Sequence, residues 1–217
     1  AHAQLAASEE RFKNFADEMP EVLWVAAPNQ QALWVNLAYE RLLGRPRAAL
    51  AADPADWMHA VHPDDRQAML AAWRADDGEP LNQDFRVIQP DGSSRHMTLR
   101  GWTDRSSGFR YGLAEDVTAR RRHKELLEAL VEGLPDATLI IDGAGTIIRV
   151  NARAEEVLGA DRAELVGSSP ERFLPEALRA DHIIARQGYH AAPTRRQMGR
   201  RTGLTAVGAD GREFPVD

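Results

Sequence analysis

The chain has 217 residues, of which 43% are hydrophobic and 28% charged, and its 27 basic and 33 acidic residues give a formal charge of −6 at pH 7. This composition argues against a disordered chain and a strongly basic nucleic-acid binder, and the length favours one large or two small domains. The absence of cysteine excludes disulfides, thiolate catalysis and cysteine-ligated metals. No apolar run reaches the roughly 18 residues of a membrane span, so no membrane contact is expected.

The first element predicted along the chain is an amphipathic helix over residues 1–18. Leu5, Phe12 and Met19 are seven residues apart, and Phe15 lies between them. A seven-residue spacing of apolar side chains is typical of helices that pair with one another. We interpret Leu5, Phe12 and Phe15 as a dimerisation stripe, with the alternative that the stripe covers the sheet of its own domain.

Two short strands and a helix are predicted next. Val22–Ala26 and Ala32–Val35 are apolar runs separated by a polar turn, which is typical of buried strands. Asn36 is predicted to cap the following helix, because its side-chain oxygen can accept a free N–H of the first turn. Gly44 is predicted to close that helix in the left-handed conformation.

A longer helix and a three-stranded meander complete the first half of the chain. The segment His62–Arg66 predicts a helix start, with an early proline and with acidic side chains near the positive end of the helix dipole. Leu81–Gln89 and Ser94–Thr103 flank Pro90-Asp91-Gly92, a turn typical of hairpins. Phe109–Glu115 is predicted to be the fifth strand.

A basic and then leucine-rich segment predicts a linker helix over residues 119–132. Leu127 and Leu130 lie on its apolar face at helical spacing, and we interpret them as a second dimerisation stripe. The basic run Arg120–Lys124 has no interleaved aromatic residues, so it favours a solvated helix face over a nucleic-acid patch.

The junction that precedes this linker helix is a candidate relay. Thr118 is predicted to cap the helix, and Asp116 is predicted to pair with Arg120 or Arg121 and so to set the angle at which the helix begins. The alternative is that Asp116 and Thr118 only terminate a strand.

The second half of the chain repeats the first. A shift of 115 positions places Val35-Asn36 on Val150-Asn151 and Leu43-Gly44 on Leu158-Gly159. A repeat of this length indicates a duplicated domain, not a solenoid. The chain has no initiator methionine and stops at Asp217 within a predicted strand, so we expect a fragment of a longer protein whose second domain lacks its last strand.

This order of strands, short helices, a longer helix and a meander resembles a PAS domain, twice. The matching motifs are Val35-Asn36, His62-Pro63-Asp64-Asp65-Arg66, Pro90-Asp91-Gly92-Ser93, Asp116-Val117-Thr118 (similar to the family's Asp-Ile-Thr end signature), Leu134-Pro135-Asp136-Ala137, Val150-Asn151 and Asp210-Gly211. The resemblance implies an α+β fold with two PAS-like domains, each a five-stranded antiparallel sheet with helices on one face. The expected organisation is an N-terminal helix (1–18), PAS domain 1 (19–118), a linker helix (119–132) and PAS domain 2 (133–217).

His182 is the one candidate for cofactor chemistry. Leu174, Leu178, His182 and Ala185 are four, four and three residues apart, which predicts that His182 lies on the inward stripe of a helix. A neutral imidazole in an apolar pocket can ligate haem iron, and the residues around His182 resemble the proximal region of haem-binding, oxygen-sensing PAS domains. Thr202 stands where that group carries a pocket arginine. The alternative is a core histidine that bonds a backbone carbonyl.

The sequence shows no catalytic constellation. It has no phosphate loop, dinucleotide fingerprint or nucleophile elbow, and capping explains His62 and Asp64 without a metal. We therefore expect no enzymatic activity from this part of the protein.

The resemblance implies a sensory and regulatory role. The two domains perceive a signal or mediate dimerisation, and relay it through the linker helix to an output domain of the same chain, such as a histidine kinase or a diguanylate cyclase or phosphodiesterase. It also implies a bacterial homodimer in the cytoplasm, or the cytoplasmic part of a membrane-anchored receptor. The alternatives are a haem-based gas sensor that uses His182 and a ligand-free dimerisation scaffold.

Overall fold

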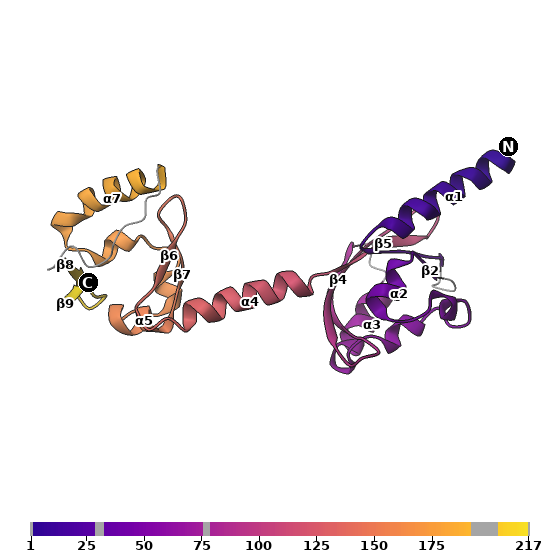
Figure 1. Ribbon diagram of the computed structural model, residues 1–217, viewed down its shortest axis with the longest axis horizontal. Coiled ribbons are helices and arrows are strands. Elements are labelled where there is room, and N and C mark those ends of the chain that lie inside the picture. The colour runs from indigo at the N-terminus through magenta and orange to yellow at the C-terminus, as the bar shows by residue number, and fades with distance from the viewer. Residues whose placement is uncertain (1, 29–32, 76–78, 192–203, 217) are drawn as a thin grey trace. The chain divides into compact units, whose positions relative to one another are not determined.

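The structure is a computed structural model that describes residues 2–28, 33–75, 79–191 and 204–216 (Figure 1). Helices and antiparallel strands occur in both halves, which confirms the predicted α+β class. The chain divides into two compact units, residues 1–123 (unit 1) and residues 124–217 (unit 2).

Unit 1 opens with a long helix and then combines one sheet with short helices. Its elements are α1 (His2–Glu18), β1 (Val22–Ala26), β2 (Leu33–Val35), α2 (Ala38–Leu43), the 3-10 turns η2 (Arg47–Ala51), η3 (Asp56–His59) and η4 (Pro63–Asp65), α3 (Arg66–Arg74), β3 (Leu81–Ile88), β4 (Ser94–Thr103) and β5 (Arg110–Asp116).

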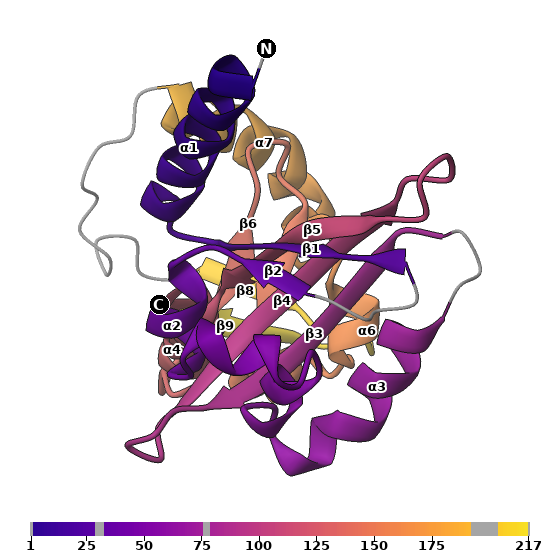
Figure 2. The same cartoon turned by 90° about the vertical axis from the view of Figure 1, so that its right-hand side faces the viewer.

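The sheet of unit 1 has the predicted five antiparallel strands, in the order β2-β1-β5-β4-β3. Successive side chains of a strand point to opposite faces, so alternate residues of β1 (Val22, Trp24 and Ala26) are buried on one face. Helices α2 and α3 lie on one face of the sheet (Figure 2). Their buried side chains, such as Tyr39 and Met69, join β1 in one apolar core.

The helix α4 (Thr118–Glu132) runs from unit 1 into unit 2 as one continuous helix (Figure 1). The elements that follow it are β6 (Leu139–Ile141), β7 (Ile147–Val150), α5 (Ala152–Leu158), α6 (Arg162–Leu165), the 3-10 turn η5 (Pro170–Phe173), α7 (Glu176–Ala191), β8 (Leu204–Val207) and β9 (Glu213–Val216).

The strands of unit 2 form two pairs and not one sheet. β6 pairs with β7, and β8 pairs with β9, both antiparallel. They correspond in chain order to β1–β2 and β3–β4 of unit 1, where β5 lies between β1 and β4. The described residues of unit 2 contain no counterpart of β5, the strand that the second domain was expected to lack.

Most of the residues predicted to begin or end the short helices have that role in the structure. Gly44 and Gly159 close α2 and α5 with left-handed φ angles of 68° and 66°, as predicted. Asn151 caps α5, because its Oδ1 accepts the Ala154 N–H at 3.0 Å. The prediction for Asn36 was wrong, because its side chain bonds other segments and Leu37 occupies the N-cap position of α2.

Among the described residues, no helix has both the length and the apolar composition needed to cross a membrane. Nor do the described residues bring three or more histidine and acidic side chains together as a metal site.

Candidate functional site

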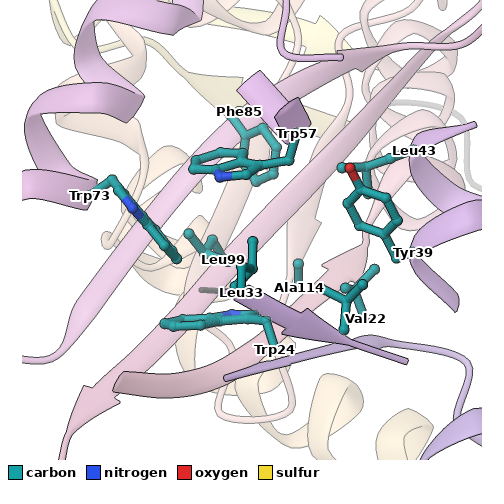
Figure 3. Close-up of a pocket in the computed structure, with 11 residues that line it drawn as sticks. Val22, Trp24, Leu33, Tyr39, Leu43, Trp57, Trp73, Phe85, Leu99 and Ala114 are labelled. Carbon is teal, nitrogen blue, oxygen red and sulfur yellow. The ribbon is translucent and has the colours of Figure 1, made fainter. Parts of the chain in front are cut away.

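Unit 1 encloses an apolar cavity between its sheet and its helices (Figure 3). The cavity has a volume of about 40 Å³. Its lining consists of Val22, Trp24, Leu33, Val35, Tyr39, Leu43, Trp57, Trp73, Phe85, Leu99 and Ala114. Since a single water needs roughly 10–15 Å³, and drug-sized ligands occupy pockets of about 300–1,000 Å³, this space fits a molecule of only a few heavy atoms.

Aromatic side chains occupy most of the space around the cavity. The ring centroids of Trp24 and Trp73 are 5.0 Å apart, and those of Trp57 and Trp73 are also 5.0 Å apart at 62°. Gly101 lets the Trp24 ring lie against β4, because a Cβ at that position would come within 2.5 Å of the ring. Trp24, Trp57 and Trp73 thus fill much of the core of unit 1 around the cavity.

Two polar groups lie within this apolar region. The indole Nε1 of Trp24 is buried and has no hydrogen-bond partner among the described residues, an uncommon situation for a buried donor. Burial raises the pKa of the Tyr39 hydroxyl, and the Asp56 carboxylate adds to this while Arg45 opposes it. Tyr39 therefore remains protonated, and its buried hydroxyl, like the Trp24 indole, has no hydrogen-bond partner among the described residues.

The second feature of unit 1 is the junction of β5 and α4, where Asp116 is the central residue. Asp116 Oδ1 accepts the Thr118 N–H at 2.9 Å, and Asp116 Oδ2 accepts Arg95 Nη1 at 2.7 Å. Burial alone would raise the pKa of Asp116, but the hydrogen bonds from Thr118 and Arg95 outweigh it and lower the pKa. Asp116 thus ties the first N–H of α4 to strand β4.

Thr118 and Arg121 extend this junction across the sheet. Thr118, predicted to cap α4, is its first residue, and its Oγ1 accepts the His96 N–H of β4 at 2.8 Å. Arg121 binds Asp84 Oδ2 on β3 and His96 Nδ1 on β4, both at 3.0 Å. The first turn of α4 is therefore bonded to β3, β4 and β5.

The pairing predicted for Asp116 was wrong. Arg120 approaches Glu115 at 3.8 Å, and Arg121 binds Asp84, so neither pairs with Asp116. The reason lies in the register of the sheet, which places Met97 opposite Asp116 and so brings the neighbouring Arg95 within reach of the Asp116 carboxylate.

The predicted dimerisation residues lie on two helices. On α1, Phe12 and Phe15 are 54% and 66% exposed, although Phe12 also approaches Trp34 of β2 with ring centroids 5.9 Å apart. On α4, Leu127 and Leu130 are 50% and 57% exposed. Leu5 belongs to α1, and its side chain lies outside the described part of the structure.

His182 does not occupy the inward position predicted from its spacing. It lies on α7 with its side chain 44% exposed, and its Nδ1 is 2.9 Å from Glu171 Oε1. Leu178, on the same predicted stripe, is also exposed. The helix is amphipathic, but the described residues that pack against it belong mainly to η5, so the apolar stripe is not covered by the sheet. The described residues around His182 do not form a haem pocket.

Glu171 is a functional candidate that the sequence did not reveal. It is buried, and it accepts hydrogen bonds from Ser169, His182 and Arg186. Burial by itself would raise its pKa, but these three bonds together lower the pKa to about 2. Partners 11 and 15 residues along the chain have no fixed spacing signature, so only the fold shows this cluster.

The comparisons with known proteins agree with this architecture. Family models described as the PAS fold match residues 32–106 and residues 125–217. The chain therefore contains two PAS domains in tandem and belongs to the PAS family of sensory domains.

Two curated proteins are similar to most of this chain. An uncharacterised protein y4lL of Sinorhizobium fredii is 31% identical over 156 residues, which cover 69% of this chain and 18% of that protein. The sensor protein FixL of Bradyrhizobium diazoefficiens is 24% identical over 173 residues, which cover 74% of this chain and 34% of FixL. The chain thus spans about a fifth to a third of the length of these relatives.

Solved structures give similar matches. A sensory box histidine kinase/response regulator from Burkholderia thailandensis is 24% identical, with 55% of this chain and 94% of that chain covered and a TM-score of 0.42. The N-terminal domain of a diguanylate cyclase with a PAS/PAC sensor from Marinobacter aquaeolei is 19% identical, with 46% and 98% covered and a TM-score of 0.40.

Proposed function

We propose that this chain is the sensory region of a larger signalling protein, in which unit 1 passes a signal through the β5–α4 junction and α4 to unit 2 and to an output domain of the same chain. In this proposal residues 19–118 and 133–217 are the two PAS domains, and residues 1–18 and 119–132 are the helices that enter them. The name of the relative FixL, a sensor protein, supports the role.

The observation that carries this proposal is the bonding of the first turn of α4 to three strands. Asp116, Thr118 and Arg121 bond it to β3, β4 and β5, so a change in sheet packing alters the angle at which α4 begins. Loss of the Asp116 cap on the first N–H of α4 costs about 1 kcal/mol of helix stability. Moving a two-state equilibrium from 1:99 to 99:1 needs about 5.5 kcal/mol. The junction therefore changes the equilibrium between the two states modestly, and a full shift needs other contacts as well.

The input of unit 1 is its apolar cavity. A molecule of a few heavy atoms in the cavity, or a change in the packing of its tryptophans, moves the strands that carry the lining. Trp24 lies on β1 and Leu99 on β4, and both strands are hydrogen-bonded to β5, which leads directly into α4.

The protein is proposed to act as a homodimer in the cytoplasm, or on the cytoplasmic side of a membrane-anchored receptor. The exposed leucines of α4 and phenylalanines of α1 are the proposed contacts between copies. A ligand-free dimerisation scaffold would use the same contacts, but its output would not depend on the β5–α4 junction.

The output domain is proposed to be a histidine kinase or a cyclic-dinucleotide enzyme. The curated relatives extend far beyond the part that this chain matches, which leaves room for such a domain. The two PAS domains themselves are proposed to be non-catalytic.

The test compares Arg121→Gln with Arg122→Gln in the full-length protein. The two arginines are adjacent on α4, but only Arg121 bonds the sheet in the described structure. A partly exposed ion pair contributes about 0.2–1 kcal/mol, so Arg121→Gln is expected to change basal autophosphorylation or cyclic-dinucleotide synthesis up to about fivefold. Arg122→Gln is expected to match the wild type. Equal outputs in the wild type, Arg121→Gln and Thr118→Ala would contradict the relay.

A further inference from the structure

The same set of charged side chains occurs where a helix enters each unit. In unit 1, Arg47 Nη1 binds Asp17 Oδ1 at 3.1 Å, and the Arg47 backbone N–H binds Glu40 Oε1 at 3.0 Å. In unit 2, Arg162 Nη2 binds Glu132 Oε2 at 3.0 Å and Glu155 Oε2 at 3.2 Å. We call each set an entry bridge: Asp17, Arg47 and Glu40 in unit 1, and Glu132, Arg162 and Glu155 in unit 2.

The two entry bridges agree position by position. Each residue of the second bridge lies 115 positions after its counterpart in the first, which is the shift that relates the two domains. The substitution of Glu132 for Asp17 keeps the carboxylate. The same arrangement of charges thus occurs twice in one chain.

Each bridge joins the last turn of the entering helix to the first turn of the next helix. Asp17, near the end of α1, accepts the Leu37 N–H at 2.6 Å, and Glu132, the last residue of α4, accepts the Ala152 N–H at 3.0 Å. The first N–H groups of a helix lack partners within it, and the helix dipole favours a negative charge there. The carboxylate of the entering helix therefore acts as the external cap of α2 or α5.

A buried asparagine beside each bridge holds the chain that leads from the entering helix into the sheet. Asn36 Nδ2 donates to Ala16 O and Glu21 O, and Asn36 Oδ1 accepts the Leu23 N–H. Asn151 makes the corresponding bonds to Asp136 O and the Thr138 N–H, and its third bond is to Leu134 O. Asn36 thus adds a second set of bonds at the last turn of α1, whereas Asn151 holds the segment that directly follows α4.

The helix that receives the bridge also reaches the interior. On α2, Glu40 belongs to the bridge, while its neighbours Tyr39 and Leu43 are buried and line the cavity. On α5, Glu155 belongs to the bridge, and Ala154 and Leu158 belong to the core of unit 2. A shift of α2 or α5 therefore moves interior side chains and the end of the entering helix together.

We propose that the entry bridge is the device that couples the position of each entering helix to the interior of the unit, so that unit 2 reads a displacement of α4 through Glu132, Arg162 and α5. In unit 1 the same device couples α1 to the cavity through α2. This role depends on the relay proposed for α4, but it is measured at the bridge itself, so the relay can fail in an output assay while the bridge still holds.

Native-state hydrogen exchange of the 217-residue chain tests the bridge. In Arg162→Gln and in Glu132→Gln, the amides at the end of α4, in the peptide 128–134, are expected to exchange about two- to fivefold faster, as the loss of a partly exposed ion pair predicts. Glu132→Asp, which keeps the carboxylate that Asp17 supplies in unit 1, is expected to retain more of the protection than Glu132→Gln. The peptide 14–20 at the end of α1 is expected to respond only to Arg47→Gln.

Arg153→Gln is the matched control. Arg153 lies on the same helix as Glu155 but pairs at 2.8 Å with Glu156 within α5, so its loss removes an ion pair without releasing α4. The proposal is overturned if the peptide 128–134 exchanges at the wild-type rate in both Arg162→Gln and Glu132→Gln. It is also overturned if protection falls equally throughout unit 2, because that result indicates a general loss of stability.

Discussion

The clearest prediction concerns the buried asparagine that occurs in both units. Asn36 is fully buried and makes three hydrogen bonds to the backbone, at 2.6, 2.9 and 3.0 Å, with the chain that enters the sheet. Asn36→Ala removes all three of these hydrogen bonds. At about 1 kcal/mol for each bond, the free energy of unfolding of unit 1 is expected to fall by about 3 kcal/mol.

Tryptophan fluorescence during urea unfolding measures this loss in unit 1 alone. All five tryptophans of the chain precede residue 104, so unit 2 contributes no tryptophan signal. With a urea dependence of about 1–3 kcal/mol per M, a loss of about 3 kcal/mol is expected to lower the midpoint by about 1–3 M. Asn82→Ala, at an exposed position of β3, is expected to leave it nearly unchanged.

The second copy gives an internal comparison. Asn151→Ala breaks the corresponding bonds in unit 2, and is expected to leave the tryptophan transition in place while lowering the stability of unit 2 measured by circular dichroism. A wild-type midpoint for Asn36→Ala would refute the reasoning. An equal shift of the tryptophan transition by Asn36→Ala and Asn151→Ala would refute the division into two units.

Three further predictions address the charged cluster, the dimer and the cofactor. Glu171 has a folded pKa of about 2, below its ordinary 4.5. Its charged form therefore stabilises unit 2 above pH 4.5, and this contribution is lost as the pH falls toward 2. Glu171→Gln is expected to flatten that part of the acid unfolding profile. Sedimentation is expected to show a dimer that Leu127→Asp or Phe12→Asp converts to monomer. After incubation with haem, the wild type and His182→Ala are expected to have the same absorption spectrum in the Soret region.

Each of these measurements has an outcome that contradicts it, and for the cofactor that outcome is a haem Soret band that is lost in His182→Ala. An acid profile that is the same with and without the Glu171 carboxylate would show that its hydrogen bonds do not stabilise the fold. A monomeric wild-type chain would contradict the proposed dimer. Leu33→Asp is not a suitable control for the dimer variants, because Leu33 packs against the core. Glu164→Gln, at an exposed position of α6, is a neutral control for both charge and assembly.

The duplicated domain could be predicted from the sequence because its signals are local. Strand alternation, the Pro-Asp-Gly turn and the closing glycines Gly44 and Gly159 each depend on a few neighbouring residues, and the structure contains all of these elements. The shift that aligns Asn36 with Asn151 also identified a shared structural role, although the bonds of Asn36 differ from the simple cap that was predicted.

The site could be predicted only in part, because its partners are brought together by the sheet. Asp116 and Thr118 were identified from the sequence, but their partners Arg95 and His96 depend on the register of β4 against β5. Helical spacing likewise showed that α7 has an apolar stripe around His182, but spacing cannot say whether another element covers that stripe.

The central claim is that α4 transmits a change from unit 1 as a continuous helix. The direct test inserts helix-forming residues between His123 and Lys124 of the full-length protein and measures its output. At 3.6 residues per turn, seven extra residues rotate the following turn by about 20°, whereas two rotate it by about 160°. The account predicts near wild-type output with seven residues and altered output with two. Equal wild-type output from both insertions, and from a flexible Gly-Ser insertion, would contradict it.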